Sequence, residues 1–173
     1  MTEHPEPPSP GPGTTPRRRR TIVALAAVII LIGMVASVEH FTRDHPVRFT
    51  DKSFTAGARS ICAGVKSRIN DRQPPGDDAT PEERAQSVER IAGILGQMVN
   101  ELRGVPVASI DARNVGRWLD DLEAFVAVGP RYAAAIRSRD PRRTEEVGNE
   151  GAAPIHRFND AARTNDLTGC VLG

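Results

Sequence analysis

An uncharged apolar segment at residues 21–38 constrains this chain more than any other feature of its sequence. Its 18 residues follow four consecutive arginines, Arg17, Arg18, Arg19 and Arg20. At a rise of about 1.5 Å per residue, a helix of this length spans about 27 Å, close to the hydrocarbon thickness of a bilayer. A helix satisfies its own backbone hydrogen bonds, so the segment can cross lipid alone. The sequence therefore predicts a single transmembrane helix over residues 21–38, with the lipid bilayer as its partner.

The distribution of positive charge predicts the orientation of this helix. The four arginines precede it directly, whereas the residues that follow it carry both signs of charge. Under the positive-inside rule, residues 1–20 lie in the cytoplasm and residues 39–173 lie outside the plasma membrane, so the four arginines are the topology determinants. Gly33 and Ser37 form a small-xxx-small pair, which favours weak self-association of membrane helices.

A cleaved signal peptide is the alternative interpretation of the same segment. The arginines would form its basic region, and residues 35–37 would provide a small-residue cleavage site. The apolar segment is longer than the usual signal-peptide core of about 7–15 residues, which favours a retained anchor. Both interpretations export the domain that follows, and secretion after cleavage stays open as the alternative location.

Composition divides the rest of the chain into a tail, a linker and one domain. Residues 1–16 contain six prolines, so residues 1–20 are expected to form a disordered cytoplasmic tail. Residues 39–50 are expected to form a juxtamembrane linker, and residues 51–173 an extracytoplasmic domain. Residues 39–173 carry a formal charge of −1, from 19 basic and 20 acidic side chains. This near-neutral balance argues against nucleic acid as a partner.

Apolar residues at helical spacing predict four helices in the domain. The second has the clearest start, because Thr80, Pro81 and Glu83 form a capping box with proline at the first helical position. Signals for strands are nearly absent. The fold class is therefore all-α: an up-down antiparallel bundle of about four helices after the transmembrane helix. The apolar positions expected to face its core are Phe54, Ala58, Ile61, Val65 and Ile69; Ala85, Val88, Ile91, Leu95, Met98 and Leu102; and Val115, Trp118, Leu119, Leu122, Phe125 and Val126.

Glycine and proline predict irregularities in the last two helices. Gly129 and Pro130 are expected to kink or interrupt the third helix, because proline lacks an N–H donor and clashes with the preceding turn. The fourth segment should begin at Pro141, with Asp140 as its N-cap. Gly148, Gly151 and Pro154 predict that it forms two pieces, with the better one at about 154–164.

Cys62 and Cys170 are the only cysteines and are predicted to form one disulfide that closes the bundle. Both follow the membrane segment and would lie in an oxidising compartment, and a bundle that returns near its start can bring them together. A redox-active pair usually has closer spacing, such as C-x-x-C. Two cysteines without a matching histidine pair give no closed zinc site.

Catalytic motifs are not found, so we expect a protein that is not an enzyme and binds no metal or cofactor. His156 and Asp160 share a helical face and could hold a metal, but two ligands do not define a site, and a surface ion pair or helix cap explains them equally well.

The ending of the chain, residues 159–170 (NDAARTNDLTGC), carries a resemblance. The chain resembles uncharacterised small membrane-anchored or secreted all-helical proteins of high-GC Gram-positive bacteria, which combine a proline-rich tail with an N-x-x-A-R-x-x-x-L-x-x-C-like ending. The resemblance implies the fold and the location given above, and no reaction.

These observations favour a non-enzymatic, membrane-tethered helical module of the cell envelope, in a structural role or acting through an unidentified envelope protein partner. The alternative is a sensor or carrier of a small ligand or lipid, with its site between the helices near Gly129 and Pro130.

Overall fold

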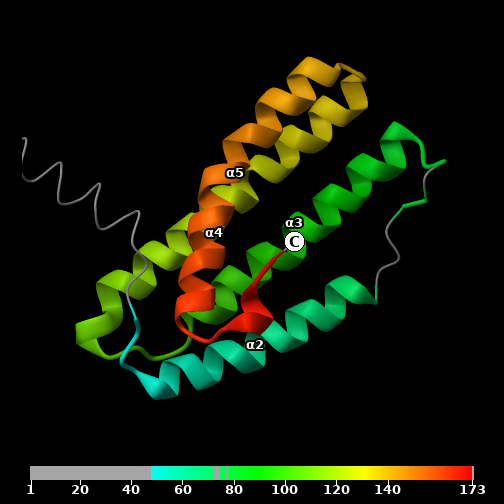
Figure 1. Cartoon of the computed structure of the whole chain (residues 1–173). Helices are drawn as coiled ribbons and strands as arrows, with labels where there is room; N and C mark the ends of the chain where they lie inside the picture. Colours follow the sequence, from blue (N-terminus) through cyan, green and yellow to red (C-terminus); the bar gives the residue numbers. More distant parts are fainter. Residues whose placement is uncertain (1–47, 72–74, 77, 173) are drawn as a thin grey trace, which may run out of the picture. The chain divides into compact units, whose positions relative to one another are not determined.

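The fold is all-α in the part of the chain that the computed structural model describes, residues 48–71, 75–76 and 78–172. Consecutive helices run in opposite directions, as an up-down arrangement requires (Figure 1). The all-α prediction is confirmed. The elements are α2 (Lys52–Asn70), α3 (Pro81–Arg103), α4 (Ser109–Ser138), α5 (Pro141–Thr164) and the short 3₁₀ helix η1 (Thr168–Cys170).

Each helix packs mainly on the next one in the chain, and η1 packs against both α2 and α5. The C-terminal segment therefore links the first described helix to the last. Phe49, from the predicted linker, also packs on the domain, because its ring meets the rings of Phe54 and Trp118 edge to face.

No helix among the described residues is long and apolar enough to span a membrane. The tail with Arg17, Arg18, Arg19 and Arg20, the predicted membrane helix at 21–38 and most of the linker lie outside the described residues. The membrane anchor therefore stays a prediction from sequence.

Side-chain caps start three of the helices, and two of these caps, Thr80 and Asp140, were predicted from the sequence. The Thr80 hydroxyl accepts the N–H of Glu83, and the Glu83 carboxylate accepts the N–H of Thr80, which confirms the capping box. Asp51 caps α2 and Asp140 caps α5 in the same way. Each cap satisfies N–H groups that the first turn of a helix leaves without a partner.

One hydrophobic core joins the helices. Trp118 lies at its centre, where its ring stacks on that of Phe158 with centroids 4.9 Å apart and its Nε1–H donates to the Phe158 carbonyl at 3.1 Å. Most positions predicted to face inward are buried or packed against this core. The largest fully buried side chains of the core are Phe54, Phe158, Met98, Leu102, Leu122, Leu167 and Val65.

The expected interruption at Gly129 and Pro130 does not occur, because α4 is one helix of 30 residues. Proline inside a helix costs about 3 kcal/mol. Packing on both sides of the proline offsets this cost, since Val128, Ala133 and Ala135 are all buried.

The expected division of the fourth segment is also wrong, because α5 runs unbroken through Gly148, Gly151 and Pro154. The two glycines let α5 approach α4 closely: a Cβ at Gly148 would lie 3.3 Å from the ring of Tyr132, and one at Gly151 would lie 3.2 Å from the ring of Phe125. Here tertiary packing overrides the low helix propensity of glycine.

We expect Gly129→Ala to lower the free energy of unfolding by about 1–3 kcal/mol, because the new Cβ would lie 2.7 Å from the Cβ of Ala92 on α3. Gly93→Ala is the matched control, since no atom lies within 4 Å of its added Cβ. It should stabilise the chain by about 0.5–1 kcal/mol through helix propensity. Urea unfolding of both variants measures the difference, and equal shifts would contradict the close contact.

Candidate functional site

Two adjoining apolar cavities between the helices form the candidate site, here called the groove. The first cavity has a volume of about 320 Å³ and lies between α3, α4 and α5. It occupies the part of α4 near Gly129 where the sequence suggested a ligand site. The described residues make its wall almost wholly apolar, and among them only Tyr132 carries a hydroxyl. The lining residues are Val88, Ile91, Ala92, Leu95, Phe125, Val126, Val128, Gly129, Tyr132, Gly148 and Gly151.

The second cavity has a volume of about 410 Å³ and lies between α2, α3, Phe125 of α4 and the C-terminal segment. It shares Ile91, Leu95 and Phe125 with the first cavity, so the two cavities adjoin at these residues. Lys66 and Asn70, one helical turn apart on α2, are its polar members. The remaining lining residues are Cys62, Val65, Ile69, Met98, Gly169, Val171 and Leu172.

Ile91 shows that the groove opens to solvent. The sequence places Ile91 on the buried stripe of the second helix, but its side chain is 37% exposed and lines both cavities. An apolar side chain that is more than a third exposed where two apolar cavities adjoin marks a surface suited to binding an apolar group.

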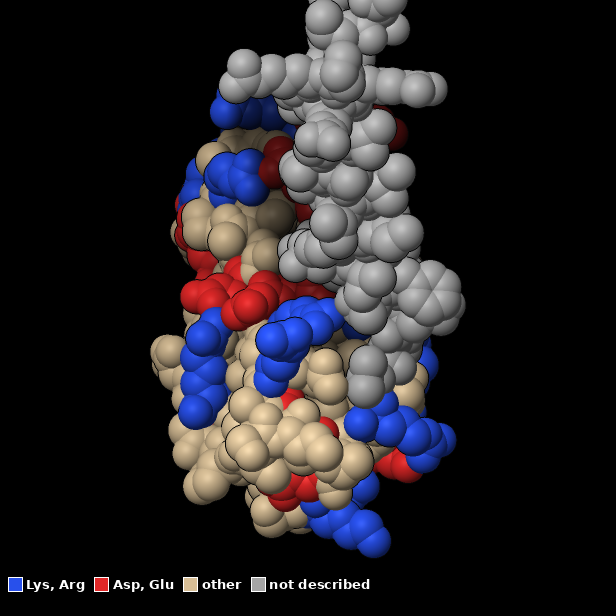
Figure 2. Space-filling view, turned by 90° about the vertical axis from the view of Figure 1, so that its left-hand side faces the viewer, with Lys and Arg blue, Asp and Glu red and all other residues tan. Residues whose placement is uncertain are grey.

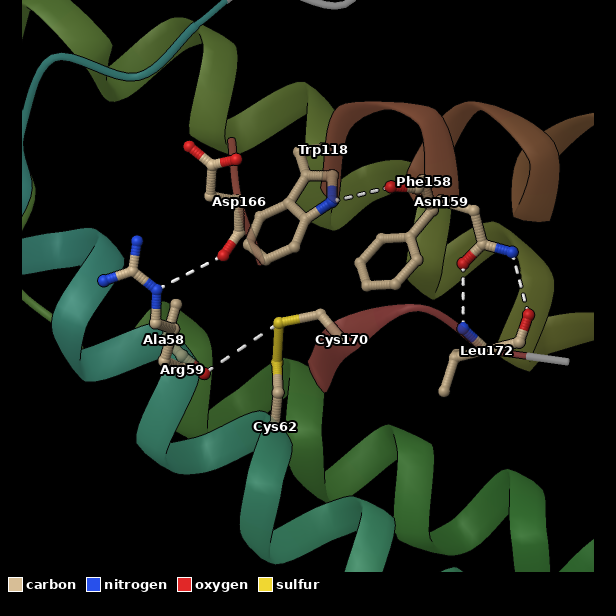
Figure 3. Close-up of a disulfide and its surroundings, with 9 residues drawn as sticks. All are labelled: Ala58, Arg59, Cys62, Trp118, Phe158, Asn159, Asp166, Cys170 and Leu172. Atoms are coloured by element: carbon tan, nitrogen blue, oxygen red, sulfur yellow. Dashed lines mark hydrogen bonds between the residues drawn. A yellow bond between two sulfur atoms is a disulfide. The ribbon is translucent and has the colours of Figure 1, made fainter. Parts of the chain in front are cut away.

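The Cys62–Cys170 disulfide holds the C-terminal segment against α2 at one side of the groove (Figure 3). The two Cα atoms are 4.8 Å apart, although 108 residues separate them in the sequence. The predicted disulfide is therefore confirmed. The sequence treated this bridge as a closure of the bundle, and the structure adds that Cys62 lines the second cavity.

Two asparagines among residues 159–170 make long-range contacts: Asn159 holds the same C-terminal segment, and Asn165 holds the residues before α2. The Asn159 amide donates to the Leu172 carbonyl at 2.8 Å and accepts the Leu172 N–H at 2.9 Å (Figure 3). Asn165 ends α5 and accepts the N–H of Phe49. Together with buried Ala162 and Leu167, these residues give the N-x-x-A-R-x-x-x-L-x-x-C pattern a role in closing the fold.

Two carboxylates fasten the residues before α2 to the start of α4. Asp111, which is buried, accepts the N–H groups of Thr50 and Asp51, each at 2.7 Å. Asp51 in turn accepts the N–H of Ala108 at 2.7 Å. No local sequence pattern reveals the contact of Asp111 with Thr50 and Asp51, because 61 and 60 residues separate the partners.

The carboxyl group of Asp51 has its pKa lowered to about 2, first by the Ser53 hydroxyl and then by the backbone N–H groups of Phe54 and Ala108. A carboxylate with a depressed pKa stabilises the fold above its unfolded value, near 3.8, and loses this contribution as the pH falls towards 2. We therefore expect the melting temperature to fall across this window. Asp51→Asn should make this decrease in melting temperature smaller, and thermal unfolding at a series of pH values measures it. If the melting temperatures of the two proteins fell equally with pH, the stabilising role of Asp51 would be contradicted.

His156 and Asp160 have no third metal-ligating side chain grouped with them in the described part of the chain. Both are exposed, and Asp160 forms an ion pair with Arg163 at 3.0 Å. No group of three or more metal-ligating side chains occurs among the residues that were placed.

Charged side chains of both signs are interspersed on the face shown in Figure 2, with no continuous basic surface among the residues described there. The main network joins Arg137 at the end of α4 to Glu82 and Glu89 of α3. The Arg137 guanidinium lowers the pKa of both glutamates, and they raise the pKa of Arg137. The network ties two helix ends together and lies away from the lining of the groove.

No known protein family, curated protein or solved structure matches this chain. The groove and its contacts therefore carry the functional argument.

Proposed function

We propose that this protein is a membrane-tethered, extracytoplasmic helical module that acts by binding an apolar ligand in the groove, as a sensor or carrier. The observation that carries the proposal is the pair of adjoining apolar cavities. Each has a volume within the range of about 300–1,000 Å³ that is typical of small-molecule sites. An almost wholly apolar wall with a few polar groups at one place is also typical of such sites.

The proposed location outside the cytoplasm is supported by the disulfide. Stable disulfides form mainly in oxidising compartments, and this one lies in the buried core, where both cysteines are shielded. The four arginines and the apolar segment at 21–38 supply the proposed anchor and its orientation. Secretion after cleavage would place the same domain in the same compartment.

Binding of an envelope protein partner, which the sequence favoured, remains the second interpretation. Under both interpretations we propose that the protein acts by binding and not by catalysis. Volume favours the small ligand. An α-helix is about 10–12 Å across, which is wide for cavities of this size. A protein partner would therefore use the rim of the groove and leave its interior unfilled.

A photo-reactive phenylalanine at position 91 of the full chain, in intact cells, tests the proposal. Ile91 lies at the junction of the cavities, and Ile110, 72% exposed at the start of α4, is the matched control position. We expect an adduct of small-molecule mass at position 91 and not at position 110. A protein-sized adduct at position 91 would identify a protein partner instead. Equal labelling at both positions would contradict a binding role for the groove.

A further inference from the structure

We propose that the ligand of the groove is a single-chain amphiphile with an anionic head group, such as a long-chain carboxylate. The head group would lie against Lys66 and Asn70, and the chain would extend through the second cavity into the first. This inference rests on the proposed function and specifies the chemistry of its ligand.

The distribution of charge in the lining points to an anion. Lys66 is the single charged side chain among the described residues that line the two cavities. Its ammonium group forms no ion pair or hydrogen bond there, whereas two other cations of α2 are engaged: Arg59 donates to the Asp166 carbonyl and Arg68 pairs with Glu101. A cation without a protein partner, at the edge of an apolar cavity, is suited to an anionic head group.

The amide of Asn70 adds a second donor beside this cation. Residues 66 and 70 are four positions apart in α2, so their side chains lie on the same face of the helix. Both line the second cavity. An ammonium and an amide N–H on one face can each donate to an oxygen of the same carboxylate.

The arrangement of the cavities points to a chain rather than a compact apolar molecule. Lys66 and Asn70 line the second cavity, while the first has the Tyr132 hydroxyl and no charged side chain among its described lining residues. The two cavities adjoin at Ile91, Leu95 and Phe125, which belong to both linings, and we infer that a path between them passes these residues. A flexible apolar chain can follow such a path and leave its polar end at Lys66.

Photo-labelling of the full chain in cell membranes tests this inference. The probes are a straight-chain fatty acid and the alcohol of equal length, each with a diazirine at its methyl end. We expect both probes to label residues of the first cavity. The acid should label them about fivefold more than the alcohol, because its carboxylate gains an exposed ion pair with Lys66 and a hydrogen bond from Asn70. A diazirine beside the carboxylate should label α2 near Lys66 instead.

Variants of the two lysines identify the head-group contact. Lys66→Glu should remove the preference for the acid, and Lys66→Arg should keep it. Lys52→Glu changes the only other lysine, also exposed on α2 but outside the lining, and should have no effect. Ile91→Glu should abolish labelling by both probes, whereas Ile110→Glu should not. The four side chains changed in these five variants are exposed, so equal unfolding midpoints would show that the variants remain folded.

The outcomes separate the two proposals. Labelling of the groove by both probes equally, with no effect of Lys66→Glu, would overturn the anionic ligand and leave the apolar site in place. No labelling of the groove by either probe, or capture of a protein there, would overturn both. A preference for the acid that depends on Lys66 supports both.

Discussion

Replacing Cys62 and Cys170 together by alanine is expected to lower the free energy of unfolding by about 4 kcal/mol. The bridge closes a loop of 108 residues, so its removal greatly increases the conformational entropy of the unfolded chain. Both cysteines are also buried in the core, so each alanine leaves unfilled space. Because small domains are stable by only about 5–15 kcal/mol, this loss is a large fraction of the total.

Urea unfolding of the full chain measures this loss. Ala63→Ser is the matched control, because position 63 lies beside Cys62 on the exposed side of α2 and should change stability by less than about 0.5 kcal/mol. Protease should also cut the C-terminal segment faster in the double variant, since Cys170 anchors the residues that line the second cavity. An unchanged unfolding midpoint would show that the bridge adds no stability.

Trp118→Ala is expected to cost about 3–5 kcal/mol, the range for truncating a buried aromatic side chain. Trp118 stacks on Phe158 and meets Phe49 and Phe54 edge to face, so it connects α2, α4, α5 and the residues before α2. Removing the indole would leave a cavity where all of these segments meet. Circular dichroism during denaturation is the suitable measurement, because Trp118 is the only tryptophan and its fluorescence is lost.

Trp118→Phe separates ring packing from hydrogen bonding. Phenylalanine keeps an aromatic face for Phe158 but loses the Nε1–H that donates to the Phe158 carbonyl. We expect a loss of about 1–2 kcal/mol, clearly smaller than that of the alanine variant. Equal losses for the two variants would mean that ring size and the hydrogen bond, rather than aromatic stacking, dominate at this position.

Helix positions were predictable because their signals are local. Thr80 and Glu83 contact each other within one turn, and Asp140 caps the helix that begins beside it. The residues at these positions are therefore sufficient to predict where α3 and α5 begin. The inward positions of α2 and α4 follow from spacing for the same reason: a helix repeats every 3.6 residues wherever it lies.

The predicted interruptions failed because local propensity ignores what packs against a helix. Pro130 and Pro154 each remove a backbone donor, yet α4 and α5 continue through them. Gly129 and Gly151 lower helix propensity by themselves, but in the fold they admit Ala92 and Phe125 at close range. The energy of those contacts depends on residues far away in the sequence, so no local rule contains it.

The groove was only partly predictable. The sequence placed a site near Gly129, and a cavity lies there, but it gave no reason to single out Lys66 or Asn70. It placed Ile91 in the core, where a regular stripe would put it. Ile91 is exposed because the C-terminal segment and α5 leave space beside α3, and that space is a property of how the helices pack together.

The amino-acid sequence by itself determined the all-helical class, the caps that begin α3 and α5, and the pairing of two distant cysteines. These follow from backbone geometry within a turn or from having only two cysteines in the chain. The tertiary structure alone decided that α4 and α5 are unbroken, that Asp111 fastens the residues before α2, and that an apolar groove with Lys66 in its lining opens between the helices. Each of these depends on atoms brought together from segments far apart in sequence, where packing and desolvation outweigh local preference.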